Sequence, residues 1–407
     1  MHEARERRRQ VRRWAEAALV ATGLLACRAG EPPPAASEQA PGAPSVDATA
    51  RAARGAPAAA APPRGSGGGA PAVGPVTERG ASGAAEGPWS SPAACRAAVA
   101  RGDRSPRAPG AARVGTWNVR WFPDGGPGSR PHEEKATDVA WLACTIAWLD
   151  VDVLAVQEFK ASARAQRGTS ALLDELGRLT RHQWRVRLDG CPNADGQHVG
   201  LLWREERATS LGFVELAELN PHGEACKDQL RPGLAGYFRF PGGLDLHLVS
   251  VHLKSGPERR SYDLRRRSVA ALPAALRALA AGAPEIDADV LVAGDLNTMG
   301  CRKCSPAGTA EEELQVLERE LAALRPELVR VAADPACTEY YGGKGGLLDH
   351  FLAARSLTEL PRGRPARAAG LCGEAACRRV RGEMPASYER LSDHCPLVLE
   401  LEDRDAD

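Results

Sequence analysis

Short apolar runs that end on polar side chains recur along the chain from about Arg113 onward, and they constrain its fold more than any other feature. The clearest is Asp289–Thr298, in which an apolar run stops at Gly294 and is followed by Asp295 and Asn297. A run of this length and composition predicts a buried strand. Glycine permits a tight turn, and residues two apart on an extended chain point the same way. We therefore expect a carboxylate and a carboxamide together at the end of a strand, the alternative being a simple Asx turn.

The other apolar segments predict a domain that mixes helices and strands. Strands are expected at residues 114–119, 152–156, 184–188, 199–203, 236–240, 244–253, 347–352 and 395–401. Apolar residues at helical spacing predict helices at 132–149, at 169–179 and from residue 260, the last kinked or divided at Pro273. Residues 309–312 form a capping box for a helix that ends at 324. Many short strands with a few helices predict two packed sheets flanked by helices.

The first 112 residues have the composition of an export signal and a linker. Arginines between residues 5 and 13 precede a short apolar run at 17–26, which is typical of a signal peptide and too short to span a bilayer. Leu24-Leu25-Ala26-Cys27 resembles the lipobox of bacterial lipoproteins, the alternative being an ordinary secretory signal. We predict a lipoprotein signal peptide at 1–27, a disordered Ala/Pro/Gly-rich tether at 28–112 and a folded domain at 113–403. The protein would then be extracytoplasmic and anchored to a membrane through Cys27.

The cysteines are consistent with export. The chain has 11 of them, which leaves an even number besides Cys27, and disulfides are the default in an oxidising compartment. Cys301 and Cys304 have the spacing of a redox or zinc half-site, but a second half-site at zinc spacing is missing, so a structural disulfide is expected. Cys372 and Cys377 are close enough in sequence to close a small loop, and the remaining pairings stay open.

Polar residues suited to phosphate chemistry lie near the ends of many of the predicted strands. They are Asn118, Glu158, His252, Asp295 with Asn297, Asp349, and Asp393 with His394. The motifs that contain them are GTWNV (115–119), AVQE (155–158), SVHLKS (250–255), GDLN (294–297), LDH (348–350) and SDH (392–394). In wording and order they resemble the endonuclease/exonuclease/phosphatase superfamily, which includes DNase I-like nucleases, abasic-site endonucleases, inositol polyphosphate phosphatases and sphingomyelinases. The resemblance implies an α+β fold, a four-layer αββα sandwich of two mainly antiparallel sheets flanked by helices.

The resemblance also implies a metal site. Glu158 matches the principal Mg²⁺ carboxylate of the family, with Asn118 beside it and Asp393 close to the ion. Hard oxygen ligands are those that Mg²⁺ prefers, and Mn²⁺ or Ca²⁺ are alternatives.

Five residues match catalytic positions of the family. Asp295 and Asn297 would position or deprotonate the attacking water and bind the scissile phosphate. Asp349 would orient His394, whose imidazolium would stabilise phosphoryl charge or protonate the leaving oxygen. His252 would be a second histidine facing the phosphate. His350 is expected to be an ordinary core histidine.

Two basic residues match substrate-binding positions. Arg231, before Pro232, resembles a phosphate-contacting arginine, although a solvated loop arginine is the alternative, and Lys254 would contact a flanking phosphate. The chain departs from the DNase I pattern at Gln197-His198, where those nucleases have a glutamate that partners the first histidine. We therefore expect His252 to lack a carboxylate partner there.

Three functions remain after this comparison. The first is an exported, Mg²⁺-dependent phosphoesterase that hydrolyses phosphodiester bonds of DNA or RNA, acting as a monomer with no protein partner inferred. The second is a phosphatase or phospholipase C of the same fold, acting on sphingomyelin or inositol phosphates. The third is a binding lipoprotein without activity, which the complete set of catalytic residues disfavours. With 53 basic and 52 acidic residues, any nucleic-acid groove must be local. The arginines between 259 and 267 either line such a groove or, as is commoner, lie on a solvated helix face.

Overall fold

The computed structural model describes residues 87–126, 135–282 and 289–406, all within one unit that spans 79–407. The predicted signal peptide, the lipobox cysteine and the tether up to residue 86 lie outside these described ranges. None of the helices in the described ranges combines the length and the hydropathy needed to cross a bilayer.

The end of the predicted tether is ordered, so the prediction is wrong for residues 87–112. Helix α2 (Pro92–Ala100) begins after Ser91, whose side chain accepts a hydrogen bond from Ala94 N. Trp89 is buried edge-on against Trp117 of the domain, with ring centroids 6.0 Å apart. A few large apolar residues bury this stretch, and a composition averaged over 28–112 conceals them.

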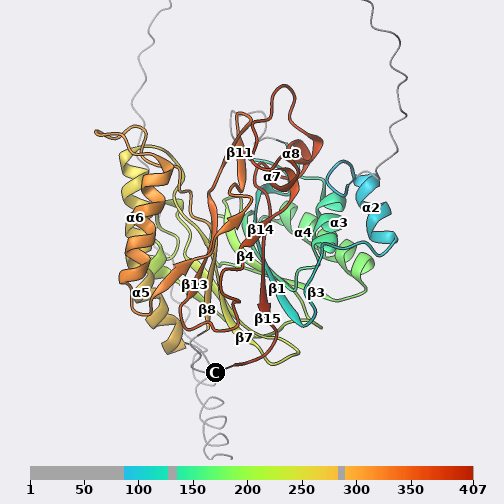
Figure 1. Ribbon diagram of the computed structural model, residues 1–407, viewed down its shortest axis with the longest axis horizontal. Helices are drawn as coiled ribbons and strands as arrows, with labels where there is room; N and C mark the ends of the chain where they lie inside the picture. The colour runs from blue at the N-terminus through green and yellow to red at the C-terminus, as the bar shows by residue number, and fades with distance from the viewer. Residues whose placement is uncertain (1–86, 127–134, 283–288, 407) are drawn as a thin grey trace, which may run out of the picture. The chain divides into compact units, whose positions relative to one another are not determined.

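Two sheets form the centre of the domain (Figure 1). The seven-stranded sheet has the order β10 (Ala333–Asp334), β14 (Ala366–Ala368), β15 (Leu397–Glu402), β1 (Ala111–Phe122), β2 (Val153–Phe159), β4 (His198–Arg204), β3 (Trp184–Leu188). The six-stranded sheet has the order β5 (Thr209–Leu216), β6 (Gly233–Arg239), β7 (Asp245–His252), β8 (Val290–Asp295), β13 (Asp349–Ala354), β9 (Leu328–Arg330). A separate hairpin pairs β11 (Glu339–Tyr341) with β12 (Lys344–Gly346). Most neighbouring strands are antiparallel, which confirms the predicted architecture.

Helices cover both outer faces of the sheet pair (Figure 1). The seven-stranded sheet packs against α2, α3 (Val139–Leu149) and α4 (Ala163–Thr180), and the six-stranded sheet against α5 (Arg259–Gly282) and α6 (Ala310–Ala323). The remaining helical segments are short: α7 (Gly370–Ala375), α8 (Ala386–Arg390), η1 (Ala217–Leu219) and η2 (Lys227–Gln229). The result is the predicted four-layer αββα sandwich.

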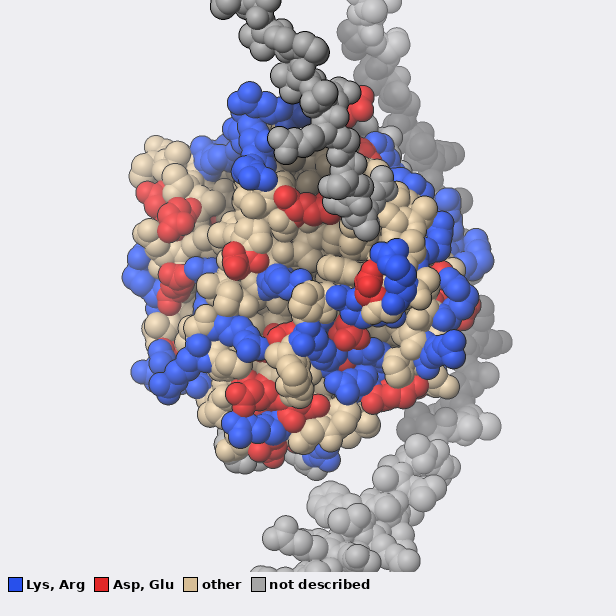
Figure 2. Space-filling view, turned by 45° about the vertical axis from the view of Figure 1, so that its right-hand side comes forward, with Lys and Arg blue, Asp and Glu red and all other residues tan. Residues whose placement is uncertain are grey.

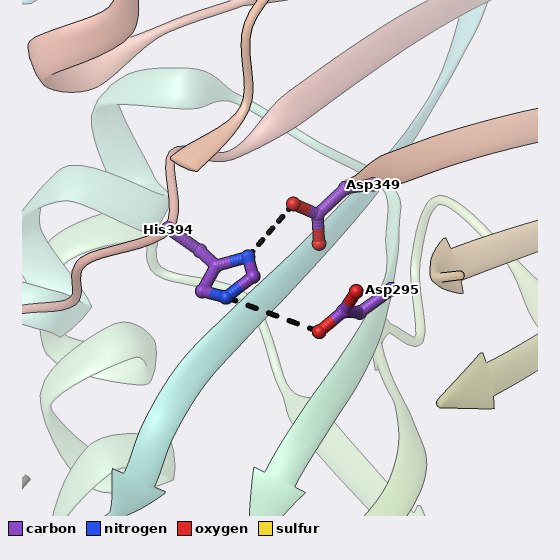
Figure 3. A group of neighbouring side chains, drawn as sticks. All are labelled: Asp295, Asp349 and His394. Atoms are coloured by element: carbon purple, nitrogen blue, oxygen red, sulfur yellow. Dashed lines mark hydrogen bonds and ion pairs between the residues drawn. The ribbon is translucent and has the colours of Figure 1, made fainter. Parts of the chain in front are cut away.

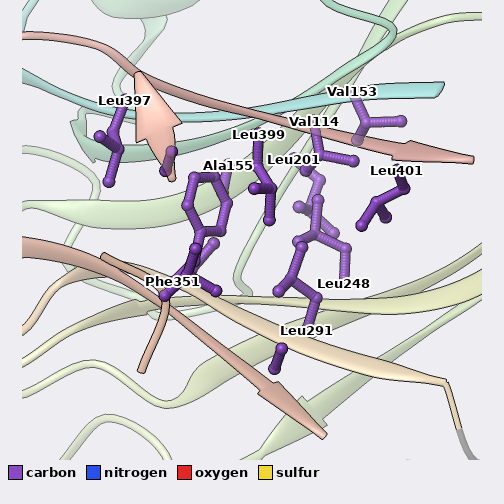
Figure 4. Packing of buried hydrophobic residues seen from close by; sticks show 14 of the residues in the cluster. Val114, Val153, Ala155, Leu201, Leu248, Leu291, Phe351, Leu397, Leu399 and Leu401 are labelled. Carbon is purple, nitrogen blue, oxygen red and sulfur yellow. The ribbon is translucent and has the colours of Figure 1, made fainter. Parts of the chain in front are cut away.

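Alternation along the central strands divides the core into layers. On β2, Val153 and Ala155 point between the sheets, while Leu154 and Val156 point toward α3 and α4. Figure 4 shows the inter-sheet layer, where residues such as Phe351 fill the space between the two sheets. Each fully buried apolar side chain of this kind contributes about 1.5–3 kcal/mol.

The helix predictions were right in kind and partly wrong in extent. The capping box at Thr309 is present and begins α6. Helix α4 begins after Ser162, earlier than the predicted start at residue 169, because Ser162 accepts a hydrogen bond from Ala165 N. Helix α5 runs through Pro273 without being divided.

Five disulfides join cysteines of the described ranges, and they correct one prediction. They are Cys95–Cys144, Cys191–Cys226, Cys301–Cys304, Cys337–Cys377 and Cys372–Cys395. The predicted Cys301–Cys304 disulfide is confirmed. A loop closed between Cys372 and Cys377 is wrong, because both residues pair with strand-flanking cysteines that only the fold brings near.

Candidate active site

Two parallel strand pairs bring four of the predicted site residues to one place. In the first pair Asn118 lies on β1 and Glu158 on β2, and in the second His252 ends β7 and Asp295 ends β8. Helices α3 and α5 make the crossovers, so that both strands of each pair run the same way and their carboxyl ends meet at one edge. Because the two sheets pack face to face, both edges contribute to one polar cluster.

Asn118 connects the two sheets at this cluster. Its Nδ2 donates to Glu158 Oε1 at 3.0 Å and to Asp295 Oδ2 at 3.1 Å, while its Oδ1 accepts from Arg120 N at 3.0 Å. Asn118 is completely buried. In this arrangement the amide holds two carboxylates in register across the sandwich, and its predicted contact with a metal ion stays a prediction.

Glu158 has a backbone conformation that is uncommon for a residue with a side chain. Its φ is 64°, and the pairing of β2 with β4 shifts register beside it. Strain of this kind costs of order 1–3 kcal/mol and collects at functional sites. Glu158 Oε2 accepts from Trp121 N at 3.0 Å, so both carboxylate oxygens are fixed.

The electrostatics of this carboxylate fit the predicted metal site. Burial raises the pKa of Glu158 against the lowering effect of its hydrogen bond to Asn118, and the charge of Asp393 raises that pKa further. Asp393 is placed by Ser392, whose hydroxyl donates to Asn118 O at 2.7 Å and lies 3.4 Å from Asp393 Oδ1. Buried carboxylates that repel one another are stabilised by a divalent cation, and their oxygens suit Mg²⁺. The same oxygen donors would accept Mn²⁺ or Ca²⁺ as well.

A second group, Asp295, Asp349 and His394, lies beside the first (Figure 3). His394 Nδ1 is hydrogen-bonded to Asp349 Oδ2 at 2.8 Å, and its Nε2 lies 3.9 Å from Asp295 Oδ2. Burial by itself lowers the pKa of His394, but the charges of Asp349 and Asp295 outweigh it and raise that pKa well above its ordinary value. One donor atom of each residue lies within 4.8 Å of the others. Because the histidine and one carboxylate already bind each other, the group suits proton transfer better than metal binding.

Asp295 is the meeting point of the cluster. Burial raises its pKa to about 7, with the charge of His394 lowering it and that of Asp349 raising it. Its other oxygen, Oδ1, accepts from Asn297 N at 2.8 Å, and Asn297 Nδ2 donates to Leu253 O at 3.1 Å. Gly294, with a φ of 151°, makes this possible, because a Cβ there would lie 2.0 Å from Val251 O. A carboxylate that ionises near neutrality can take a proton from water.

His252 differs from His394 in its surroundings. Its Nε2 lies 3.4 Å from Asp295 Oδ2, but its Nδ1 is buried and has no partner among the described residues. Burial lowers the pKa of His252 well below its ordinary value, and the positive charge of Arg231 lowers it further. The glutamate that partners this histidine in the DNase I pattern has no counterpart at Nδ1 among the described residues. His198, which lies where the chain departs from the DNase I pattern, is hydrogen-bonded through Nδ1 to Asp189 Oδ1 at 2.8 Å.

The two predicted substrate-binding residues lie near the cluster. Arg231 donates through Nη2 to His252 O and through Nη1 to Gln197 Oε1, both at 3.4 Å, while its buried Nε has no partner among the residues described. Burial lowers its pKa, and the charges of Glu158 and Asp295 oppose that effect. Lys254 is partly buried, and burial lowers its pKa before the charge of Arg231 lowers it further. Arg231 is therefore the cation that interacts with the acidic cluster, and Lys254 lies close enough to His252 to lower the pKa of that histidine.

Other polar residues singled out in the sequence have structural surroundings. His350 is buried, hydrogen-bonded to Thr298 Oγ1 at 2.8 Å, and burial lowers its pKa to about 3, as expected for a core histidine. In the arginine run at 259–267, Arg265 forms a buried ion pair with Glu313 and two of the others pair with helix neighbours. These pairs favour the solvated and structural interpretation of that run.

One acidic residue of the site escaped the sequence analysis. Glu339 on β11 pairs with His394 through an isolated backbone β-bridge. Burial raises the pKa of Glu339 to about 8, while the charge of His394 lowers that pKa and the charge of Asp393 raises it. The preceding Thr338 accepts hydrogen bonds from Leu348 N and Asp349 N. A strand of three residues carries no periodic signal, so nothing in the sequence marked it.

Comparisons with known proteins show which family the chain resembles. The sequence model of the Endonuclease/Exonuclease/phosphatase family matches residues 115–394. No curated protein matches the chain. Similar solved structures include an endonuclease/exonuclease/phosphatase from Bacteroides vulgatus (14% identity, TM-score 0.47, 72% of this chain and 98% of that chain). Another is the human Nocturnin catalytic domain (15% identity, TM-score 0.43, 71% of this chain and 93% of that chain). A third is a humanized D. rerio TDP2 (17% identity, TM-score 0.44, 72% of this chain and 98% of that chain).

Proposed function

The chain belongs to the endonuclease/exonuclease/phosphatase family, whose members are generally hydrolases of phosphoester bonds, and we propose that it is a divalent-metal-dependent nuclease. The observation that carries the proposal is the convergence on Asp295 Oδ2, which lies 3.1 Å from Asn118 Nδ2, 3.4 Å from His252 Nε2 and 3.9 Å from His394 Nε2. A base, an imidazolium and a carboxylate pair at one point are the groups that hydrolysis at phosphorus needs.

Each residue has a defined part in the proposed reaction. Glu158 and Asp393, with Asn118, would hold Mg²⁺, which when bound polarises a phosphoryl oxygen. Asp295 takes a proton from the attacking water, in keeping with its pKa of about 7. His394, kept protonated by Asp349, donates its Nε2 proton to the leaving oxygen.

The remaining residues bind and orient the phosphate. Arg231 and Lys254 present positive charge to the non-bridging oxygens and to a flanking phosphate. His252, whose pKa is lowered, acts as a neutral imidazole that hydrogen-bonds the phosphate rather than as an acid. Asn297 fixes the Asp295 carboxylate through its backbone N–H.

A substrate panel tests the proposal. Purified protein with Mg²⁺ should hydrolyse plasmid DNA, linear DNA or RNA, EDTA should abolish this activity, and Asp295→Asn should lack it. Release of choline phosphate from sphingomyelin, or of phosphate from inositol phosphates, with no cleavage of nucleic acid would replace the nuclease by a phospholipase C or a phosphatase of the same fold. If the protein hydrolyses none of these substrates, the binding protein without activity is the interpretation that remains.

We also propose that the enzyme works outside the cytoplasm, anchored through a lipidated Cys27. The five disulfides support an oxidising compartment. Incorporation of labelled fatty acid into the wild-type chain but not into a Cys27→Ser variant, with loss of membrane association, is the expected result. A variant that stays on the membrane would contradict the anchor.

A further inference from the structure

A group of basic residues stands on the hairpin next to the active site. Lys344 on β12 and Arg378, Arg379 and Arg381 in the loop after α7 are all exposed. Tyr341, at the end of β11, is 54% exposed. We call these five residues the basic hairpin surface. Figure 1 shows β11 beside α7 and α8.

The loop and the hairpin are held together by specific contacts. Val380 N donates to Gly343 O at 2.8 Å, and Tyr340 Oη donates to Arg378 O at 2.9 Å. The Cys337–Cys377 disulfide closes the base of the same unit. The basic side chains therefore stand on a backbone that is fixed rather than on an isolated loop.

This surface adjoins the catalytic cluster. Tyr340 N donates to Asp393 O at 2.9 Å, and Glu339 pairs with His394 through an isolated backbone β-bridge. Tyr341 is two residues further along the strand, or about 7 Å at the rise of a β-strand. A substrate bound at His394 would therefore meet this surface within a short distance.

The cations of the surface have no acidic partner among the described residues. Among the described residues, none of its three arginines nor Lys344 forms an ion pair, whereas Arg330 pairs with Glu318 and Arg355 with Glu327. Basic and acidic side chains are otherwise mixed over the face seen in Figure 2, as a net charge of +1 predicts. A local excess of unpaired cations on a fixed support favours a polyanionic ligand.

A nucleic-acid strand fits this surface better than an anionic membrane. Membrane-binding surfaces combine cations with a continuous apolar face. The large exposed apolar residues of the described part, Leu211, Val329 and Tyr341, lie on three different strands and form no such face. A single exposed ring among arginines is instead suited to stacking with an unpaired base while the arginines bind phosphates.

We propose that the basic hairpin surface binds single-stranded nucleic acid next to the scissile phosphate, a specificity that rests on the proposed nuclease function. Arg378, Arg379 and Arg381 contact successive phosphates, and Tyr341 stacks on a base. Each contacted phosphate on a single strand contributes about 0.7 to the slope of log affinity against log salt concentration.

The test measures binding separately from hydrolysis. The affinity of the full chain for a fluorescein-labelled 12-nucleotide DNA strand is measured by anisotropy in EDTA over a range of salt concentrations. Replacing the three arginines by glutamine (R378Q/R379Q/R381Q) should lower the salt slope by about 2. Tyr341→Ala should weaken binding at least about fivefold with the slope unchanged.

A matched variant controls for the loss of charge itself. Arg277, Arg319 and Arg362 are also exposed and form no ion pair among the described residues, and R277Q/R319Q/R362Q should leave affinity and slope unchanged. Hydrolysis of bis(p-nitrophenyl) phosphate with Mg²⁺ should be the same in all these variants, because it needs only the catalytic cluster.

Distinct outcomes separate this proposal from the proposed function. Equal losses of oligonucleotide affinity in both triple variants would refute the proposed binding surface. It would also be refuted if R378Q/R379Q/R381Q lost binding to phosphatidylglycerol vesicles but kept its affinity for the oligonucleotide. Selective loss of oligonucleotide binding together with an absence of nuclease activity in the wild-type chain would uphold the surface and refute the nuclease.

Discussion

Replacing Asp349 by asparagine tests the proposed role of His394 most directly. Asparagine keeps the size of the side chain and an acceptor 2.8 Å from His394 Nδ1, but it removes the charge. A hydrogen bond to a charged group contributes about 1.5–3 kcal/mol, and one pKa unit corresponds to about 1.4 kcal/mol. The pKa of His394, which Asp349 raises, should therefore fall by about 1–2 units.

The sign of the pH effect follows from the group that ionises. The imidazolium is present below the pKa of His394 and is lost as the pH rises through it, so a lower pKa moves the basic limb of the rate profile to lower pH. We expect that limb to shift by about 1–2 units in Asp349→Asn, with about 10–100-fold less activity on its alkaline side. The assay is hydrolysis of bis(p-nitrophenyl) phosphate at saturating Mg²⁺ between pH 5 and 10.

The pair formed by Asp189 and His198 provides the control. It has the same separation of 2.8 Å and is buried, but it lies outside the carboxylate cluster. Asp189→Asn should leave the basic limb in place even if the variant is less stable. A slower Asp349→Asn enzyme whose basic limb does not move would refute the assignment of His394 as the proton donor.

Four further changes have definite expected results. Asp295→Asn should reduce kcat by about 10²–10⁴-fold. It should not lower Tm in EDTA at pH 8, because the pKa of Asp295 is about 7 in the folded protein, above its unfolded value, so that ionisation of this carboxyl opposes folding. A clear drop in Tm would contradict this. Glu158→Gln should weaken Mn²⁺ binding at least about tenfold in calorimetry, and unchanged affinity would place the ion elsewhere. Glu339→Gln should leave the rate at pH 7 unchanged and lower it only above pH 8, where the wild-type carboxylate is charged; a loss at both pH values would indicate another role. Cys372→Ser/Cys395→Ser should lose about 2–4 kcal/mol in urea unfolding and lower kcat, because Cys395 follows His394; full activity would show that the disulfide does not position the histidine.

Local signals in the sequence predicted much of the frame. Apolar runs bounded by glycine and polar residues marked the central strands, and the capping box at Thr309 marked the start of α6. Each depends on residues a few positions apart, so the chain itself carries the signal. Short or half-exposed strands, such as β5 and the β11–β12 hairpin, lack that periodicity and were missed.

Tertiary structure alone decided the chemistry of the individual groups. His252 ends one apolar strand and His394 precedes another, and their local sequences do not indicate different charge states. Folding places two carboxylates beside His394 and Arg231 beside His252, so the pKa of the first is raised and that of the second lowered. The same holds for the partner of Cys372 and for the place of Glu339 in the site. The sequence supplied the donors and their order, and the charge state of each depends on neighbours that are distant in the chain and close in space.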